Sequence, residues 1–360
     1  MFQKDVRLSD HSTIGLGGPA RYFCFARTQA EIILALRQAR EDNLGVQIIG
    51  GGSNVIFSDA GFDGLVLKVG LTGLTFRDEP SGTTAVAAAG VVWDDFVAAS
   101  IAHSCTGIEC LSGIPGLVGG TPIQNVGAYG QEVSDTIFSV RALDRKTFIP
   151  ADFSGPDCRF AYRKSRFKGE DAGRYVITEV TFRMSRGVTP VVRYAELEQF
   201  LHTSAGEPSH NPAAISPRDI RTAVLALRRK KSMVLDPGDP NTRSAGSFFV
   251  NPVITENNFI GLTDQWTRTG GAGPVPHFSA PDGVKVPAAW LVEQAGFPRG
   301  FRRGGAGISA HHSLAIVNFG GTTDEILGLA AEIEQAVRNK FGITLQREAV
   351  IVPRTLSASS

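Results

Sequence analysis

The sequence has few of the residues that build metal sites and disulfide frameworks. Its 360 residues include four cysteines, and these form no Cys-x-x-Cys pair. The histidines at 11, 103, 311 and 312 lack the His-x-x-x-His or His-x-x-Glu spacing that is typical of zinc sites. We therefore expect reduced thiols, as in a cytosolic protein, and no metal centre.

Long apolar runs and an excess of one charge are also missing. No window approaches 18 uninterrupted apolar residues, and the N-terminal segment has no basic stretch followed by an apolar one. Lysine and arginine together number 36 against 35 aspartates and glutamates, a net charge of +1. This balance gives no basic field for nucleic acid. The sequence predicts a cytoplasmic globular protein that acts on a small molecule, without a membrane or nucleic-acid partner.

Glycine, by contrast, is abundant, with 41 residues gathered between segments of clear helix and strand pattern. Thr28 and Glu31 form a capping box at the start of a predicted helix, and Gly45 suits the left-handed position that ends it. Two further helices are predicted, one opened by Ser216 and one covering 323–341. Strands are predicted over 46–49, 62–69, 135–144, 174–185, 313–319 and 343–352, with a strand, turn and helix over 83–104.

These elements alternate without a strict β-α-β rhythm, so the sequence predicts an α+β fold. Residues 185–217 include a segment rich in Ser, Pro and Gly and form a predicted linker or domain edge. The stretch between Pro252 and Gly307 is predicted to be mostly loop.

Two glycine-rich stretches differ from ordinary turns. The run of residues 50–54, "GGGSN", follows a buried strand, and glycines let a backbone approach a ligand with exposed N–H groups. This run lacks the Gly-x-Gly-x-x-Gly spacing and a P-loop lysine, so a phosphate cradle and a tight turn both remain open. The second stretch, residues 110–130, is unusually long for a structural loop. Together the two stretches predict a grip on a dinucleotide from both sides.

Motifs along nearly the whole chain, in the same order, resemble the UDP-N-acetylenolpyruvoylglucosamine reductases. They are "GGGSN", "GIPGLVGGTPIQNVGAYG", "CRFAYRKSRFK", "VVRYAEL", "SAGSFFVNP", "KVPAAWLVEQAGF" and "LQREAVIV". The resemblance implies an FAD-binding fold of the vanillyl-alcohol-oxidase/PCMH type. It implies two α+β FAD-binding subdomains over 1–70 and 71–210, an α+β substrate-binding domain over 211–340, and a C-terminal strand and tail over 341–360.

The resemblance also implies a reaction and its cofactors. NADPH would reduce FAD, and flavin N5 would pass hydride to the methylene carbon of UDP-N-acetylglucosamine enolpyruvate, giving UDP-N-acetylmuramate for peptidoglycan synthesis. Because negative charge develops on the adjacent carbon and carboxylate, the site requires a cation, an acid and a proton donor. An oligomer is not required.

Three residues match the family's catalytic positions. Arg163 matches the cation that binds the carboxylate, although a basic run by itself indicates a solvated surface. Glu348 matches the catalytic glutamate, although a carboxylate on an alternating strand commonly faces outward. Ser247 matches the proton donor, although a serine beside glycine is commonly a turn residue. Phe248 and Phe249 favour the catalytic interpretation, because they would form a water-excluding wall.

Binding residues follow from the same matching. FAD contacts are assigned to Gly50, Gly51, Gly52, Ser53, Asn54, Gly116, Gly119, Gly120, Thr121, Asn125 and Gly127. Substrate contacts are assigned to Tyr129, Tyr194, Lys231 and Asn251, where a core tyrosine and a helix-end lysine remain open alternatives. The chain departs from the family pattern at Val250, lysine or threonine in relatives, and at Arg347, proline in many of them.

Two other functions are weighed against this one. An FAD-dependent oxidase of the same fold would use oxygen and no NADPH, but neither glycine stretch has a histidine motif for covalent flavin attachment. A non-catalytic flavin- or nucleotide-binding relative would not need Arg163, Ser247 and Glu348 together.

Overall fold

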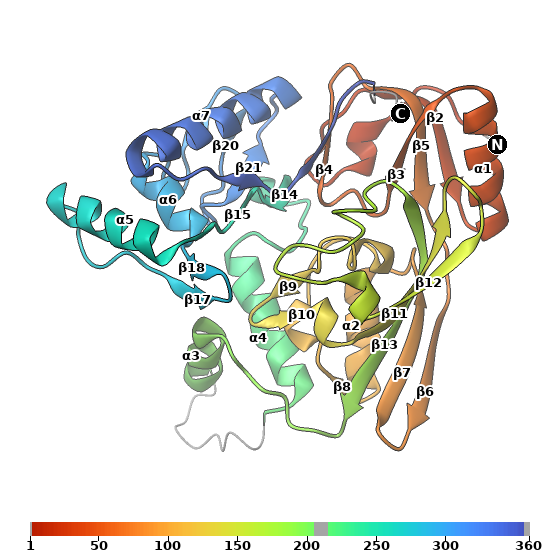
Figure 1. Cartoon of the computed structure of the whole chain (residues 1–360), viewed down its shortest axis with the longest axis horizontal. Helices are drawn as coiled ribbons and strands as arrows, with labels where there is room; N and C mark the ends of the chain where they lie inside the picture. Colours follow the sequence, from red (N-terminus) through yellow and green to blue (C-terminus); the bar gives the residue numbers. More distant parts are fainter. Residues whose placement is uncertain (1, 205–214, 356–360) are drawn as a thin grey trace.

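The first unit of the fold is a four-stranded sheet with the order β1-β2-β5-β3 (Figure 1). The computed structural model describes residues 2–204 and 215–355. Strands β2, β5 and β3 are parallel to one another, and β1 runs antiparallel to β2. The bounds are β1 (Val6–Arg7), β2 (Pro19–Ala26), β5 (Phe62–Val69) and β3 (Gly45–Ile49).

Helix α1 (Gln29–Glu41) packs on this sheet because its buried residues recur at helical spacing: Ile32, Ala35, Leu36 and Ala39. The predicted capping box is confirmed, since Thr28 Oγ1 accepts from the Glu31 N–H and the Glu31 carboxylate accepts from the Thr28 N–H. The predicted end is wrong. Asn43 takes the left-handed conformation (φ 53°), which asparagine tolerates, and Gly45 already begins β3.

The second unit is a larger antiparallel sheet with the order β12-β11-β13-β7-β6, and the short β8 pairs with the end of β13. Helix α2 (Trp93–Ala102) packs by aromatic contact, with the Phe96 and Phe182 ring centroids 4.6 Å apart. The strands and helix predicted over 83–104, 135–144 and 174–185 are confirmed. The bounds are β6 (Leu74–Glu79), β7 (Gly82–Ala88), β8 (Cys105–Thr106), β11 (Ile137–Asp144), β12 (Pro150–Ser154) and β13 (Tyr175–Arg186).

The third unit is an antiparallel sheet with the order β14-β21-β20-β19, on which α7 (Thr323–Phe341) packs. The bounds of α7 are those predicted, and Gly342 ends it in the left-handed conformation (φ 69°). The core under α7 includes Ile308, Ile316 and Ile333. The other elements are β14 (Ser244–Ser247), β19 (Arg302–Arg303), β20 (Ala306–Ile308), β21 (Ala315–Asn318) and α6 (Ala288–Gln294).

The prediction of loop between Pro252 and Gly307 is wrong. Besides α6, this stretch forms α5 (Glu256–Arg268), which Thr255 caps by accepting a hydrogen bond from the Asn258 N–H. Leu262 and Trp266 are four residues apart on the buried face of α5, a helical signal that the many turn residues around it obscured. A small sheet accompanies α5, made of β16 (Val253–Ile254), β18 (Gly283–Lys285) and β17 (Phe278–Ala280).

Helices α3 (Ala195–Ser204) and α4 (Pro217–Lys230) pack against each other, and α4 also packs against η2 (Glu109–Leu111) of the second unit. The predicted cap of α4 is confirmed, because Ser216 Oγ accepts from the Asp219 N–H. Part of the predicted linker, 205–214, lies outside the described residues, and the division into four segments with three boundaries remains a prediction. The cluster that joins these elements contains Cys110, Leu197, Ile220, Ala223, Val224 and Leu227.

The single strand predicted over 343–352 is wrong, and the correction bears on Glu348. The segment forms β22 (Gln346–Arg347), paired with β15 (Phe249–Val250), and then β23 (Val350–Val352), paired in parallel with β4 (Val55–Phe57). Glu348 lies between the two strands, where the chain leaves the third unit for the first. The direction of the Glu348 side chain is therefore set by the change from pairing with β15 to pairing with β4, and not by the alternation of side chains along one strand.

Short elements complete the connections. They are η1 (Leu8–His11), η3 (Val118–Gly120), β9 (Gly127–Ala128), β10 (Gln131–Glu132), η4 (Val133–Asp135), η5 (Pro156–Cys158) and η7 (Pro240–Thr242). Helices and strands are mixed in all three units, so the predicted α+β class is confirmed. None of the described helices is long and apolar enough to cross a membrane.

Candidate active site

A cavity of about 1860 Å³ is lined by residues of all three units. Two parts of its lining differ in kind. The glycine wall consists of residues 50–54, 116, 117 and 119–121. The charged wall consists of Arg163, Arg228, Lys231, Ser247, His312 and Glu348. The arrangement combines a surface of bare backbone with a surface of charged and hydroxyl groups.

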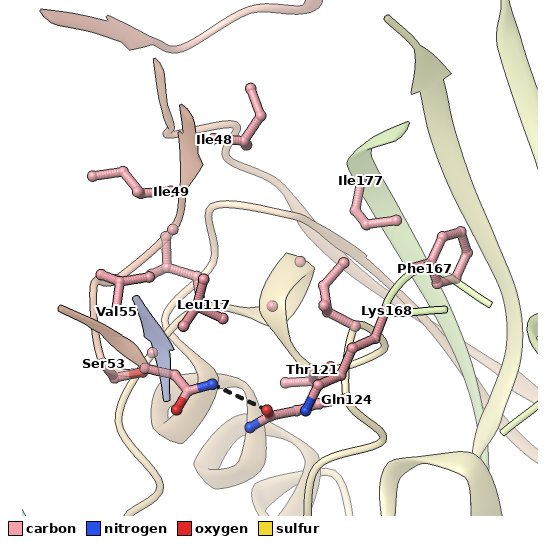
Figure 2. A pocket seen from close by; sticks show the side chains of 18 of the residues that line it. Ile48, Ile49, Ser53, Val55, Leu117, Thr121, Gln124, Phe167, Lys168 and Ile177 are labelled. Carbon is pink, nitrogen blue, oxygen red and sulfur yellow. Dashed lines mark hydrogen bonds between the residues drawn. The ribbon is translucent and has the colours of Figure 1, made fainter. Parts of the chain in front are cut away.

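The glycine wall is formed where its two stretches touch. A Cβ on Gly51 would lie 2.8 Å from the Gly116 Cα, so a side chain there would push the stretches apart. Gly116 has φ 125° and Gly52 has φ 70°, conformations that favour glycine. Ser53 Oγ donates to the Pro115 carbonyl at 3.0 Å, and Figure 2 shows Ser53 and Leu117 on neighbouring parts of this wall.

The glycine wall fits a phosphate-containing cofactor. Within the described chain, the N–H groups of Gly51, Gly52, Ser53 and Asn54 donate to no other residue. Unpaired N–H groups in a glycine-lined concavity are what a pyrophosphate requires. Every residue assigned to FAD lines the cavity except Asn125. The Asn125 side chain instead donates to Glu132 Oε2 at 2.7 Å and so braces the second stretch.

Arg163 is held on the charged wall by backbone. It lies in the left-handed region (φ 55°), and its Nη2 donates to the Gly127 carbonyl at 2.8 Å. Its Nε lies 3.0 Å from Glu348 Oε1 in an ion pair, yet is buried and makes no hydrogen bond to a described residue. Arg159, four residues earlier in the basic run, is largely exposed and paired with Glu170. The two arginines therefore separate into a cavity group and a surface group.

Glu348 is nearly buried beside Arg163, and its backbone N–H donates to the Phe248 carbonyl at 2.8 Å. Gln124 Nε2 donates to Glu348 Oε1 at 3.3 Å, and Asn54 Nδ2 donates to Gln124 Oε1 at 3.0 Å, the bond drawn in Figure 2. Burial raises the pKa of Glu348 above its ordinary value, although Arg163 acts in the opposite direction. The carboxyl group is thus able to hold a proton more readily than a surface glutamate.

Ser247 ends β14, directly after Gly246 in its left-handed conformation (φ 75°). Its Oγ lies 3.1 Å from Nε2 of His312. The next residues, Phe248 and Phe249, are buried with ring centroids 5.2 Å apart, so they pack in the core behind the serine. Burial, together with the smaller effect of the nearby cations Lys231 and Arg228, lowers the pKa of His312 to about 4.

Two tyrosines and two cations also line the cavity. The rings of Tyr129 and Tyr194 meet edge to face at 5.3 Å, and Lys231 Nζ lies 5.7 Å from the Tyr129 ring centroid. Arg228 donates from Nη2 to the Met233 carbonyl, while its buried Nε has no hydrogen bond to a described residue. Burial lowers the pKa of Arg228 and raises the pKa of Tyr129 to about 12. These groups form a pocket suited to an anion.

The assignment of Asn251 as a substrate contact receives no support from its position. Asn251 lies outside the cavity lining; its Oδ1 accepts from the Ala288 N–H at 2.8 Å, and its Nδ2 donates to the Tyr162 hydroxyl at 3.3 Å. It therefore joins α6 to the residue before Arg163. Neither departure from the family pattern reaches the cavity: Val250 pairs with β22 and Arg347 binds Glu334 on α7 at 2.6 Å.

Four cavity residues were missed by reasoning from the sequence: Gln124, Lys168, Arg228 and His312. Gln124 and Lys168 stand inside the quoted motifs, so their place in those motifs was a usable signal. Lys168 lines the cavity (Figure 2), and burial lowers its pKa. Arg228 carried a weaker signal, the basic end of α4. His312 carried none, because 65 residues separate it from Ser247.

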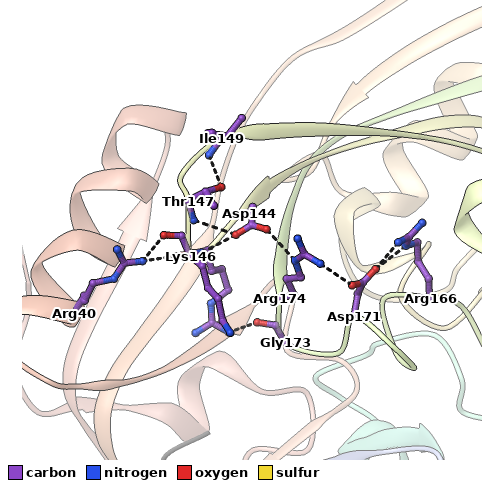
Figure 3. A network of polar contacts seen from close by, with 10 residues as sticks. Arg40, Asp144, Lys146, Thr147, Ile149, Arg166, Asp171, Gly173 and Arg174 are labelled. Carbon is purple, nitrogen blue, oxygen red and sulfur yellow. Dashed lines mark hydrogen bonds and ion pairs between the residues drawn. The ribbon is translucent and has the colours of Figure 1, made fainter. Parts of the chain in front are cut away.

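A polar network includes further residues that line the cavity, and Figure 3 shows its contacts. Arg40 on α1 donates to the Lys146 carbonyl, and the Asp144 carboxylate accepts from the N–H groups of Lys146 and Thr147. Arg174 pairs with Asp144 at 2.9 Å. These bonds join α1, β11 and the chain before β13, and so hold the first two units together. Within residues 2–204 and 215–355, no three His, Cys, Asp or Glu side chains gather as a metal ion would require.

Comparisons with known proteins agree with this architecture. Residues 20–147 match the family described as an FAD binding domain. Residues 239–352 match the family described as the C-terminal domain of UDP-N-acetylenolpyruvoylglucosamine reductase. The solved UDP-N-acetylenolpyruvylglucosamine reductase of Thermus caldophilus has a TM-score of 0.63 at 21% identity, covering 98% of this chain and 100% of that one. The predicted fold is confirmed.

Curated relatives match over the full length. The UDP-N-acetylenolpyruvoylglucosamine reductase of Thermobifida fusca is 44% identical over 361 residues, covering 99% of both chains. The enzyme of that name from Streptomyces coelicolor is 45% identical, covering 97% of this chain and 89% of the relative. With a glycine wall that fits a dinucleotide and a charged wall beside it, the chain belongs to the UDP-N-acetylenolpyruvoylglucosamine reductase family.

Proposed function

We propose that this protein reduces UDP-N-acetylglucosamine enolpyruvate to UDP-N-acetylmuramate, with NADPH as reductant and FAD as cofactor. The observation that carries the proposal is that Arg163, Ser247 and Glu348 line one cavity together with the glycine wall. The product is a peptidoglycan precursor, so the activity serves cell-wall synthesis and, through it, cell shape and division, in the cytoplasm. A single chain supplies every group that the proposal uses, so no second copy is required.

FAD would be held by the glycine wall, with the N–H groups of residues 51–54 on its pyrophosphate. When bound, the flavin accepts two electrons from NADPH and supplies them to the enolpyruvyl methylene carbon as hydride. The protein's own part is to orient the enolpyruvyl group, to stabilise the charge that develops on it and to supply a proton.

Arg163 is proposed to bind the enolpyruvyl carboxylate. Its Nε is buried without a hydrogen bond to a described residue, and the backbone carbonyl of Gly127 fixes its Nη2. A fixed guanidinium stabilises an enolate as charge accumulates on the carboxylate oxygens. Glu348, whose pKa is raised by burial, would donate a hydrogen bond to one of those oxygens.

Ser247 is proposed to protonate the carbon next to the carboxylate. The O–H bond breaks as the new C–H bond forms, and the core around Phe248 keeps this side of the serine free of water. Tyr129, Tyr194, Lys231 and Arg228 would bind the substrate diphosphate. Asn251, initially matched to a substrate contact, would act indirectly by orienting Tyr162 beside Arg163.

The test is an anaerobic flavin titration of the purified protein. NADPH should bleach the yellow flavin, and UDP-N-acetylglucosamine enolpyruvate should restore the colour with formation of UDP-N-acetylmuramate. A flavin that NADPH cannot reduce, or that the substrate cannot reoxidise, contradicts the proposal. Rapid recovery with oxygen alone would favour an oxidase, and a flavin inert to all three reagents would favour a non-catalytic binding protein.

A further inference from the structure

We propose that His312 is the proton source that serves Ser247, and that an anion bound at Arg228 and Lys231 brings His312 into its charged form. The proposal rests on the proposed function. The main evidence is the 3.1 Å contact between Ser247 Oγ and His312 Nε2. Both residues line the cavity that Arg228 and Lys231 also line. The mechanism otherwise leaves this imidazole without a role.

The backbone fixes the serine and the histidine against each other. Ser247 on β14 is paired with Ala315 on β21, and the Phe248 N–H donates to the Leu314 carbonyl at 2.8 Å. The Ala315 N–H donates to the His312 carbonyl at 3.1 Å, which closes a tight turn. The paired strands therefore position Ser247, and the closed turn positions the His312 imidazole beside it.

The need for a partner follows from the chemistry of serine. A hydroxyl that gives its proton to carbon becomes an alkoxide, a strong base that does not persist near neutral pH. In the proposed step, Ser247 Oγ–H breaks as the C–H bond forms, and imidazolium Nε2–H breaks as a new Oγ–H bond forms. The hydride has already supplied both electrons, so the step only moves protons. Neutral His312 then regains a proton from solvent.

The charges around His312 control whether its imidazole carries the proton that it would give to Ser247. Lys231 and Arg228, at the end of α4, are the cations that act on it, and both lower its pKa in the protein without ligand. Glu196 pairs with Lys231, and Glu293 on α6 accepts a hydrogen bond from the neighbouring Ser313. A diphosphate on the two cations offsets their effect and favours the imidazolium form. Substrate binding would thereby charge the proton source.

The kinetic test uses His312→Gln, whose amide keeps a hydrogen-bond donor beside Ser247 but cannot release a proton. Stopped-flow absorbance follows both flavin half-reactions. Reoxidation by the enolpyruvyl substrate should fall by about 10- to 100-fold, with reduction by NADPH nearly unchanged. The wild-type reoxidation rate should fall as pH rises above the pKa of His312 in the complex, and the variant rate should not. His311→Gln is the matched control, since His311 contacts Ser232 and lies outside the cavity lining.

Three kinetic results would overturn the role of His312. They are a glutamine variant that reoxidises at the wild-type rate, one that keeps the wild-type pH profile, and one that loses both half-reactions equally. A wild-type flavin that the substrate cannot reoxidise would instead count against the proposed function, so the two failures are distinguishable.

A binding measurement tests the charge coupling without turnover. Calorimetric titration with UDP, in buffers of different ionisation enthalpy near neutral pH, reports protons taken up on binding. We expect uptake by the wild-type protein and by His311→Gln, and its loss in His312→Gln at similar UDP affinity. Equal uptake in all three proteins, or none in the wild type, would overturn the coupling.

Discussion

Along the glycine wall the backbone itself faces the cavity, whereas along the charged wall side chains from distant segments do so. The glycine wall comes from two local stretches, each continuous in sequence. The charged wall takes Arg163 from the second unit, Ser247 and His312 from the third, and Glu348 from the crossing between units. The comparison shows that the glycine wall depends on the absence of side chains, which exposes the backbone. The charged wall depends on tertiary pairing, which brings side chains from distant segments together.

The largest expected effect falls on the charged wall. Ser247→Ala should slow flavin reoxidation by the enolpyruvyl substrate by about 10³-fold, because the proton donor is gone. Flavin reduction by NADPH should change by less than about twofold, because the glycine wall is intact. Stopped-flow absorbance measures both steps. Ser244→Ala on the same strand is the control, and equal losses in both steps for Ser247→Ala would make the serine structural.

A second substitution separates the two arginines of one basic run. Arg163→Lys should reduce substrate-dependent reoxidation by about 10²-fold, because an ammonium cannot replace the guanidinium held by the Gly127 carbonyl. Arg159→Lys, at an exposed position paired with Glu170, should have almost no effect. Steady-state kinetics with varied enolpyruvyl substrate measure both variants. Comparable losses would show that the run acts only through its overall charge.

The glycine wall is tested by adding a single methyl group. Gly51→Ala should weaken FAD binding by at least about tenfold, because its Cβ would lie 2.8 Å from the Gly116 Cα and force the two stretches apart. FAD release on dilution, followed by flavin fluorescence, gives the affinity. Gly328→Ala on α7 is the control, since an added Cβ there meets nothing within 4 Å. Normal FAD affinity in Gly51→Ala would show that the close contact between Gly51 and Gly116 is not needed for FAD binding.

The smallest effect concerns stability and pH. The pKa of His312 is lowered from 6.5 to about 4 in the folded protein, so the unfolded chain binds an extra proton between these values. Wild-type stability should therefore fall as pH drops through this window and be fully present above it. Because the ring also borders the open cavity, we expect about 1 to 2 kcal/mol of difference from His312→Gln.

Urea unfolding of both proteins at about pH 7 and about pH 4.5 would measure this difference. His311→Gln serves as the reference for replacing a histidine on the same turn. If the stability of the wild type and of His312→Gln changes in parallel with pH, the folded protein does not hold the ring in its neutral form.

Local features of the fold were predictable because their causes are local. The capping box at Thr28, the N-cap at Ser216 and the limits of α7 follow from neighbouring residues, and all are confirmed. The wrong predictions concern element bounds that depend on pairing with strands far away in the sequence. Gly45 pairs with Gly64 of β5, so Asn43 takes the left-handed position after α1 in its place. The C-terminal segment breaks into β22 and β23 because each pairs with a different unit.

By itself the sequence determined the α+β class, the two glycine stretches and, through its motifs, the reductase family, since each depends on residues close together in the chain or on their order. Only the tertiary structure decided which polar groups meet. It placed Glu348 against Arg163 and His312 against Ser247, and it turned Arg347 and Asn251 away from the cavity. The physical reason is that hydrogen bonds and ion pairs act over a few ångströms, and strand pairing between units brings segments hundreds of residues apart within that range.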